Sequence, residues 1–154
     1  MAAKTRALSA LSQTPHEVIE YTPSKDHFGA HSAAELGRDP HTVLKTLVIH
    51  HERDMAICCV PVAGHLSLKA AAKALGWKRA EMTDPAQAQR ATGYVVGGIS
   101  PLGTTKRMPT LIDDSVADLE TITVSAGQRG LSIALSPTGL AELTNATFAP
   151  IGTE

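Results

Sequence analysis

Lys45 is the residue whose position most clearly suggests chemistry. Alternation along residues 43–49 places it on the same strand face as three apolar residues, Val43, Leu47 and Ile49. An ammonium group without a partner is costly to bury, so an anion or a hydrogen-bonding group must meet it. A structural salt bridge is one explanation of this pattern, and a contact to a bound substrate is the other.

A glycine-rich segment, residues 93–103, is the second candidate site. It contains four glycines and a proline: Gly93, Gly97, Gly98, Gly103 and Pro101. Adjacent glycines allow a backbone to approach a ligand closely and to direct successive N–H groups at an anion. The composition alone predicts a loop, and a tight surface turn is the alternative to a binding role.

Ser100 resembles the serine of a hydrolase nucleophile elbow only in part. Gly98 stands two residues before it, but the next glycine is Gly103, so the Gly-x-Ser-x-Gly spacing is missing. The residue after such a serine must donate its N–H to the oxyanion, and Pro101 has none. We therefore predict that Ser100 is not an elbow nucleophile.

The histidines do not predict a metal site. His27, His31 and Glu35 are spaced four apart, which on one helix would align three ligands. The intervening Phe28-Gly29 argues against a continuous helix there. A helix that begins near His31 and runs to Gly37 is the better interpretation, and we expect neither a metal nor a cofactor.

The two cysteines, Cys58 and Cys59, are adjacent and should point to opposite faces of a strand. This placement suits neither a disulfide nor a metal clamp, so we predict reduced core thiols. Residues 1–15 lack the apolar run of a secretory signal, and together these features predict a cytoplasmic protein. An organellar transit segment is the alternative, because no acid precedes Glu17. No apolar run approaches the roughly 20 residues that cross a bilayer, so no membrane partner is expected.

The charges are unevenly placed although the net charge is only -1. Residues 65–107 contain seven bases against two acids, Lys69, Lys73, Lys78, Arg79, Arg90, Lys106 and Arg107 against Glu81 and Asp84. A basic segment in a neutral protein is typical of a phosphate-binding patch, and an ordinary solvated surface is the alternative.

The apolar periodicity changes repeatedly along the chain, which predicts an α+β fold. The length of 154 residues predicts one domain, residues 1–154. Helices are predicted at 4–13, 31–37, 67–75, 84–93 and 137–144. Strands are predicted at 17–22, 43–50, 55–62, 78–82, 110–113, 121–125 and 131–135, with a turn at 51–54. The strand that contains Lys45 is apolar on both faces and should be central in its sheet.

Several motifs, in this order along nearly the whole chain, resemble the YbaK-type deacylases. They are Phe28-Gly29, Val43-Leu44-Lys45-Thr46-Leu47, Pro61-Val62-Ala63-Gly64, Met82-Thr83-Asp84-Pro85, the segment 93–103, and Val124-Ser125-Ala126-Gly127-Gln128-Arg129-Gly130-Leu131. The Lys-Thr-Leu strand followed by Gly-Gly-Ile-Ser-Pro at this separation is the most specific element. The resemblance implies a mixed, partly barrel-like sheet of about six or seven strands surrounded by helices.

The resemblance also implies a reaction, hydrolysis of the ester in misacylated tRNA(Pro), with cysteine as the typical substrate and prolyl-tRNA synthetase as a potential partner. By resemblance, Lys45 holds the aminoacylated tRNA end, and Gly97 and Gly98 present N–H groups near the ester carbonyl. The substrate-binding positions that the resemblance implies are Tyr21, Phe28, Thr46, Ser100 and Ser125.

One position departs from the family pattern, because Ser132 stands where the family often carries an acid. The implied chemistry needs no protein base, since the thiol of the substrate cysteine attacks its own ester and leaves as a thiolactone. Two alternatives stay open at this point. One is a deacylase for alanine or another small residue, and the other is a non-catalytic module that binds tRNA or the synthetase.

Overall fold

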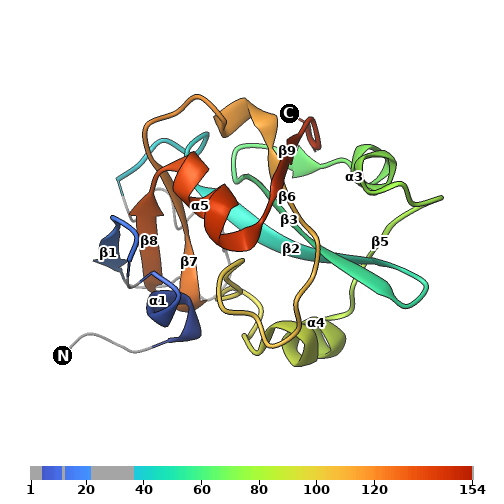
Figure 1. Ribbon diagram of the computed structural model, residues 1–154, viewed down its shortest axis with the longest axis horizontal. Helices are drawn as coiled ribbons and strands as arrows, with labels where there is room; N and C mark the ends of the chain where they lie inside the picture. The colour runs from blue at the N-terminus through green and yellow to red at the C-terminus, as the bar shows by residue number, and fades with distance from the viewer. Residues whose placement is uncertain (1–4, 12, 22–36, 154) are drawn as a thin grey trace.

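The computed structural model describes residues 5–11, 13–21 and 37–153, and Figure 1 shows their arrangement. The strands are β1 (Glu17–Glu20), β2 (Leu44–His51), β3 (Asp54–Pro61), β4 (His65–Leu66), β5 (Glu81–Met82), β6 (Thr110–Asp113), β7 (Ile122–Gln128), β8 (Leu131–Leu135), β9 (Thr147–Ala149) and β10 (Gly152–Thr153). The helices are α1 (Arg6–Ser9), α3 (Leu68–Leu75), α4 (Pro85–Thr92), α5 (Pro137–Thr144) and the 3-10 turn η1 (Asp114–Val116).

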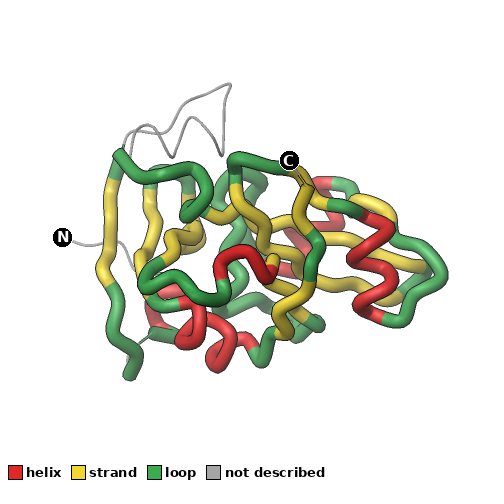
Figure 2. Tube along the Cα trace, turned by 90° about the horizontal axis from the view of Figure 1, so that it is seen from above, coloured by secondary structure: helices red, strands yellow, loops and turns green. Residues whose placement is uncertain are grey.

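The largest sheet has five strands in the order β5-β2-β3-β6-β9. Its centre is the antiparallel β2–β3 hairpin, whose turn contains Glu52 at φ 54°, and the predicted turn at 51–54 is confirmed. β6 and β9 join β3 as parallel strands. The tip of this hairpin lies at the opposite end of the molecule from β1, β7 and β8 (Figures 1 and 2).

Two smaller sheets complete the architecture, one in the order β1-β8-β7 and one formed by β10 and β4. A single parallel bridge between Val43 and Thr123 links the large sheet to β7. The predicted α+β class with a mixed sheet is confirmed. The described strands do not close into a barrel, because strand pairing between the large sheet and β7 is limited to this bridge, which lies just before β2.

The β2–β3 hairpin has a separate apolar cluster on each face, because successive side chains alternate. Leu44, Val48 and Cys59 belong to the larger cluster, which α1, α4 and α5 help to cover. Ile49 and Cys58 belong to a second cluster, which is packed under α3. The core of the large sheet therefore lies in two layers.

Side-chain caps explain why three helices form where the sequence predicts them. Ser67, Asp84 and Ser136 each accept a backbone N–H at the start of α3, α4 and α5. Gly76 and Gly93 end α3 and α4 in the left-handed conformation. The first helix is shorter than predicted, and nearly all of the helix predicted at 31–37 lies outside the described residues.

The seven predicted strands are all present, but β5 is only two residues long and three further strands, β4, β9 and β10, were not predicted. Cys58 and Cys59 are free and fully buried, as predicted. Burial raises the pKa of both thiols to about 12. No helix in the described part of the chain is long and apolar enough to cross a bilayer.

Candidate functional site

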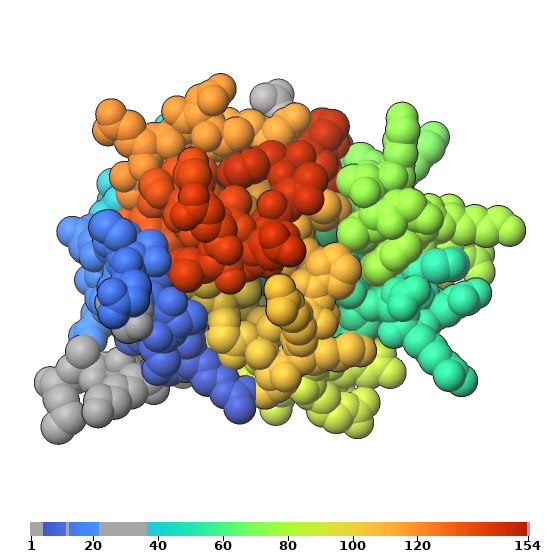
Figure 3. Space-filling view, viewed as in Figure 1, coloured from blue at the N-terminus to red at the C-terminus, as the bar shows by residue number. Residues whose placement is uncertain are grey.

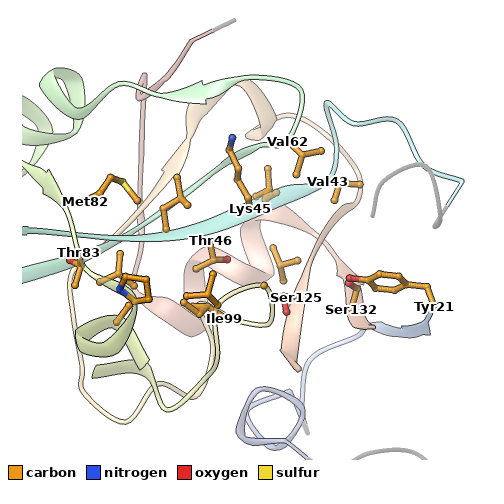
Figure 4. Close-up of a pocket in the computed structure, with 18 residues that line it drawn as sticks. Tyr21, Val43, Lys45, Thr46, Val62, Met82, Thr83, Ile99, Ser125 and Ser132 are labelled. Atoms are coloured by element: carbon orange, nitrogen blue, oxygen red, sulfur yellow. The ribbon is translucent and has the colours of Figure 1, made fainter. Parts of the chain in front are cut away.

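The main cavity of the described structure, about 330 Å³, lies along one edge of β2 (Figure 4). Its lining residues lie in or next to β1, β2, β3, β5, α4, β7 and β8, or in the glycine-rich segment 93–103, which we call the glycine loop. They are Tyr21, Val43, Leu44, Lys45, Thr46, Leu47, Val48, Val62, Met82, Thr83, Pro85, Ala88, Val96, Gly97, Ile99, Val124, Ser125 and Ser132. Most of them are apolar. None of these described lining residues is a histidine, a cysteine or a carboxylate.

The cavity exists because strand pairing along this edge of β2 is interrupted. β5 pairs with β2 only at Ile49 and His50, and Thr83 N adds a hydrogen bond to the carbonyl of Val48 at 3.0 Å. The next contact along this edge is the bridge at Val43. The carbonyl of Val43 accepts from Val62 N at 2.8 Å, toward β3. Because backbone groups alternate in an antiparallel ladder, those of Thr46 point the other way, into the gap. The prediction that this strand is central is therefore correct only toward the hairpin tip.

We call the stretch of β2 where this pairing is interrupted, around Thr46, the open edge. It divides the cavity into two flanks with different side chains (Figure 4). The Lys45 flank consists of Val43, Lys45, Leu47, Val62 and Met82. The Thr46 flank consists of Thr46, Thr83, Ile99 and Ser125. For the residues of β2, β3 and β5 and those adjoining them, the division follows from register, because neighbours on one strand point to opposite faces and directly opposed residues share a face. Ile99 and Ser125 lie on the Thr46 side of β2 in Figure 4.

Lys45 is half-buried, and its amino group points away from Thr46. Its Nζ donates a hydrogen bond to the carbonyl of Gly64 at 2.9 Å. Desolvation by burial lowers the pKa of Lys45. No carboxylate among the described residues forms a salt bridge with it, so the carbonyl is the hydrogen-bonding partner that the sequence required. Among the described residues, the structural salt bridge that the sequence also allowed is not found.

The glycine loop is held in place by an arginine from the following hairpin. Arg129 donates from Nε and Nη2 to the carbonyl of Val96, at 2.9 and 2.7 Å. Gly98 N donates to the carbonyl of Val95 at 2.9 Å, which closes a turn around Gly97 at φ 92°. This positive φ favours glycine. The turn leaves Gly97 on the cavity wall.

Gly98 has a different role from Gly97. A Cβ atom at Gly98 would lie 2.8 Å from the backbone of Gln128, so this glycine permits close packing between the loop and the β7–β8 turn. Its N–H is engaged within the loop, and Gly98 does not line the cavity. Of the two predicted N–H donors, only Gly97 is among the described residues that line the cavity.

Ser100 belongs to the same loop and is fully buried. Its Oγ accepts a hydrogen bond from Leu102 N at 3.2 Å, and it is absent from the cavity wall. This local role is typical of a serine that stabilises a turn. Ser100 therefore does not line the cavity, although the resemblance implies a substrate-binding role for it.

Ser125 and Ser132 face each other across β7 and β8. Ser132 is buried, and Ser125 is half-buried beside a bulge that follows it in β7. Tyr21 follows β1 and lies next to Ser132 in Figure 4. The structure thus brings five predicted site residues to one cavity, namely Tyr21, Lys45, Thr46, Gly97 and Ser125. Phe28, another predicted site residue, lies outside the described residues, and the roles assigned to the whole set stay predictions.

Sequence reasoning missed two contributors to this site. Arg129 stands in one of the quoted motifs without any predicted role, because its contact to Val96 spans 33 residues and leaves no local signal. Met82 stands in one of the quoted motifs without any predicted role. Its side chain is 47% exposed while it lines the cavity.

A second cavity of about 260 Å³ lies beside the hairpin tip and contains the titratable groups that the first lacks. Its lining residues are His50, His51, Glu52, Arg79 and Glu81. His50 Nε2 is 3.7 Å from Glu81 Oε2, and its Nδ1 is 3.3 Å from the hydroxyl of Thr83. Within the described residues no group of three or more potential ligands is arranged to hold a metal.

The main cavity can bind and polarise a substrate, but its described lining offers no acid–base pair. The Gly97 loop can present a backbone N–H, Thr46 and Ser125 can present hydroxyl groups, and Lys45 presents a cation at the rim. Such groups stabilise a developing oxyanion and fix geometry. A reactive group that the substrate itself carries fits this site.

Comparisons with known proteins agree with the resemblance seen in the motifs. The sequence model of the aminoacyl-tRNA editing domain matches residues 23–143. A relative from Enterococcus faecalis is 37% identical over 155 residues, covering 98% of this chain and 94% of its own. That relative carries the provisional name Cys-tRNA(Pro)/Cys-tRNA(Cys) deacylase.

Solved structures share the fold at low sequence identity. A protein described as a candidate trans-editing enzyme for prolyl-tRNA synthetase superposes with a TM-score of 0.85 at 21% identity, covering 99% of this chain and all of its own. A hypothetical protein gives a TM-score of 0.87 at 20% identity, with 97% and 100% coverage. From the family match and the sequence relative, we conclude that this chain belongs to the aminoacyl-tRNA editing domain family.

Proposed function

We propose that this chain is a trans-editing hydrolase that removes cysteine from mischarged tRNA(Pro). Membership of the editing family supports the reaction class, and the name of the Enterococcus faecalis relative supports cysteine as the amino acid and admits tRNA(Cys) as a second carrier. The observation that carries the proposal is a mainly apolar cavity with Gly97 on its wall and no carboxylate, histidine or cysteine among its described lining residues.

The chemistry begins with the substrate's own sulfur. The thiol loses its proton to solvent, and the sulfur attacks the ester carbonyl carbon. The carbonyl oxygen becomes an oxyanion that the Gly97 N–H stabilises. The bond between this carbon and the ribose oxygen then breaks, the ribose oxygen takes up a proton from solvent, and a cyclic thiolactone departs. Water later opens the thiolactone to free cysteine.

The protein's contribution is positioning and electrostatics. Thr46 and Ser125 hold the amino acid on the Thr46 flank, and the cation of Lys45 holds the nucleotide end at the rim. Ser132 stands where the family often carries an acid. Substrate-assisted attack does not need a carboxylate at this position, because the substrate supplies the nucleophile. Orientation of two reacting groups is among the largest catalytic effects available to such a site.

Cysteine must then be released faster than amino acids that match its shape but lack its thiol. We expect Cys-tRNA(Pro) to be deacylated more than about a hundredfold faster than Ser-tRNA(Pro), because fit alone discriminates isosteres by at most about that factor. A hydroxyl is far less ionised than a thiol near neutral pH and is the weaker nucleophile. tRNA(Pro) charged with 2-aminobutyrate, an apolar analogue of nearly the same shape, is the matched control.

The measurement is release of amino acid from each charged tRNA, with mass spectrometry of the first product. Thiolactone from the cysteine substrate supports the proposal, and the rate should rise with pH toward the thiol pKa of about 8.5. Equal rates for cysteine, serine and 2-aminobutyrate would contradict it. Preferred release of alanine would favour a small-residue deacylase, and no release from any substrate would favour a non-catalytic binding module.

Prolyl-tRNA synthetase is part of this proposal as a partner in the cell. One structural neighbour is described as a candidate trans-editing enzyme for that synthetase. A synthetase that mischarges tRNA(Pro) supplies the substrate, so editing should be faster when both proteins are present than when purified Cys-tRNA(Pro) is added alone. The comparison of these two rates is the measurement.

A further inference from the structure

One peptide group of the glycine loop, the one between Val96 and Gly97, has an arginine fork on its carbonyl. Arg129 donates to the Val96 oxygen from Nε and Nη2, at 2.9 and 2.7 Å. The chain has no cis peptide bond, and in a trans peptide group the C=O and the N–H point in opposite directions. By fixing the Val96 carbonyl, Arg129 therefore also fixes the direction of the Gly97 N–H.

This peptide group is also the one in the loop whose orientation is easiest to reverse. Gly98 N donates to the carbonyl of Val95, so Val96 and Gly97 are the central residues of a β-turn. Gly97 has φ 92° and Val96 has no positive φ, which is the pattern of a type II turn. Types I and II differ mainly by reversal of the central peptide group, and glycine tolerates both. The arginine selects one of the two orientations.

Other contacts hold the rest of the loop, so the effect of Arg129 is confined to its tip. Thr105 N donates to the carbonyl of Thr92 at 3.1 Å and closes the base of the loop. At the far end a Cβ atom on Gly103 would lie 2.6 Å from the backbone of Arg6. The loop, in yellow, and α1, in blue, accordingly lie side by side at the surface (Figure 3). Loss of the Arg129 contact should leave the loop in place and release only the central peptide group.

The side of the loop on which Arg129 lies indicates where the N–H points. Val96 and Gly97 line the main cavity, whereas Arg129 is exposed and is absent from its wall. The carbonyl is drawn away from the cavity, which places the N–H on the cavity side. Among the described residues, Gly97 N donates to no backbone carbonyl outside the strands and helices. A bound acceptor is therefore the partner that this N–H lacks.

We propose that Arg129 is a positioning residue for deacylation, which holds the Gly97 N–H toward the ester carbonyl and polarises the peptide group that carries it. This inference rests on the proposed function. A charged donor makes a stronger hydrogen bond to a carbonyl than a neutral one, and linked hydrogen bonds polarise each other. Arg129 acts through the Val96 carbonyl and touches no substrate atom. Its effect should be greatest when the ester oxygen becomes an oxyanion.

NMR of this single peptide group tests the contact without an activity assay. Val96-Gly97 is the only Val-Gly pair in the sequence, so protein labelled with ¹³C-carbonyl valine and ¹⁵N-glycine gives one carbonyl–nitrogen cross-peak. Arg129→Ala should move this cross-peak upfield in both dimensions, because the carbonyl loses a charged donor. Gln128→Ala, an exposed neighbour on the same turn, is the matched control and should leave it in place. An unmoved cross-peak in Arg129→Ala overturns the proposal.

Kinetics then show whether the orientation matters for turnover. Arg129→Ala should lower kcat for Cys-tRNA(Pro) about tenfold and keep KM within about twofold, because an interaction used in the transition state is lost. Arg129→Lys keeps the charge without the fork and should lose less. Arg107→Ala removes an equal charge from an exposed residue outside the cavity wall and should leave kcat unchanged. A raised KM with unchanged kcat in Arg129→Ala would show that Arg129 only attracts the tRNA, and would overturn the proposal.

A double variant separates positioning from a general loss of loop stability. Gly97→Ala already displaces the N–H donor, so adding Arg129→Ala to it should lower kcat by less than about a further twofold, whereas the effects of independent sites combine fully. Losses that multiply in full would assign Arg129 a purely structural role and overturn the proposal.

The outcomes distinguish this role from the proposed function. If Arg129→Ala moves the cross-peak but leaves kcat of an active protein unchanged, the positioning role is overturned and the deacylase stands. If the parent protein releases no cysteine, the deacylase proposal fails. The cross-peak then decides alone whether Arg129 fixes the peptide group: movement supports this, and an unmoved peak overturns it.

Discussion

Along the same strand, β2, the two cavities differ in the groups that they present. The cavity beside Lys45 is mainly apolar, and the polar groups on its wall are hydroxyls, backbone and one cation. The cavity beside His50 is smaller and is lined by two histidines, two glutamates and an arginine. A search for clustered titratable side chains would select the second cavity.

Strand pairing supports the first cavity as the proposed site. At the hairpin tip β5 pairs with β2, and the side chains there contact one another: His50 lies near Glu81 and Thr83, and the rings of His51 and Trp77 are 6.2 Å apart. Around Thr46 the pairing is interrupted, so strand backbone and the Gly97 loop line a common cavity. For a substrate that supplies its own nucleophile, enclosure and fixed dipoles matter more than titratable groups.

Substitution of one charged group in each cavity gives the largest expected contrast. Lys45→Ala should lower kcat/KM for Cys-tRNA(Pro) by about a hundredfold, because it removes a cation aimed at the substrate. The free energy of unfolding should fall by only about 1 kcal/mol, since one hydrogen bond to a carbonyl is lost.

Glu81→Gln is the matched change in the second cavity, and we expect kcat/KM to stay within about twofold of the parent, as for most surface changes. Steady-state kinetics and chemical denaturation of both variants provide the test. If Glu81→Gln were the damaging change and Lys45→Ala the neutral one, the assignment of the two cavities would be reversed.

Within the glycine loop, two substitutions separate the role of the backbone from that of the serine hydroxyl. The expected effect on activity is smaller than for Lys45→Ala. Gly97→Ala should lower turnover about tenfold or more, because alanine disfavours φ 92° and shifts the N–H donor. Ser100→Ala should leave turnover nearly unchanged, although loss of its hydrogen bond to Leu102 N costs about 1–3 kcal/mol of stability. Turnover and thermal unfolding of both variants are the readouts, and loss of activity in Ser100→Ala with a tolerant Gly97→Ala would reverse the two roles.

Chemical modification of the cysteines should have the smallest effect on deacylation, because Cys58 and Cys59 lie behind the main cavity and not in it. Cys59 Sγ is 4.0 Å from the hydroxyl of Thr46 on the inner side of β2. With pKa values of about 12, both thiols stay protonated and inaccessible near neutral pH. Treatment with iodoacetamide, followed by its removal, should leave deacylation intact, and rapid labelling of the native protein with loss of activity would contradict this.

The same pKa values predict how stability depends on pH. The unfolded thiols ionise above about pH 9, whereas the folded thiols stay protonated until about pH 12. Each cysteine therefore contributes stability below pH 9 that is lost as the pH rises from 9 to 12, by about 1.4 kcal/mol per pH unit. Denaturation curves between pH 8 and 10 should show a shallower decline in a Cys58→Ala variant.

Local signals in the sequence were sufficient for the helices and the long strands. Ser67 marks the start and Gly76 the end of α3, and the alternation of residues 43–49 identifies β2. The short strands β9 and β10 escaped prediction because they depend on distant partners. Asp113 Oδ1 accepts from the N–H groups of Ile151 and Gly152 at 3.1 and 2.8 Å, across nearly forty residues.

The site was predictable residue by residue but not in its arrangement. Lys45, Thr46 and Gly97 could be named from motifs, yet their separation into two flanks depends on where β5 stops pairing with β2. The contact of Arg129 with Val96 likewise arises only when the β7–β8 turn meets the glycine loop. Such long-range pairings have no local pattern that the sequence alone could display.

A crystal structure with a stable substrate analogue would test the account most directly. In 3′-cysteinylamino-3′-deoxyadenosine an amide replaces the labile ester, so the analogue should persist in the site. We predict that it occupies the cavity at the open edge of β2, with its carbonyl oxygen within hydrogen-bonding distance of Gly97 N and its thiol on the Thr46 flank. An analogue bound beside His50, or one whose carbonyl lies beyond about 3.5 Å from Gly97 N, would contradict the account.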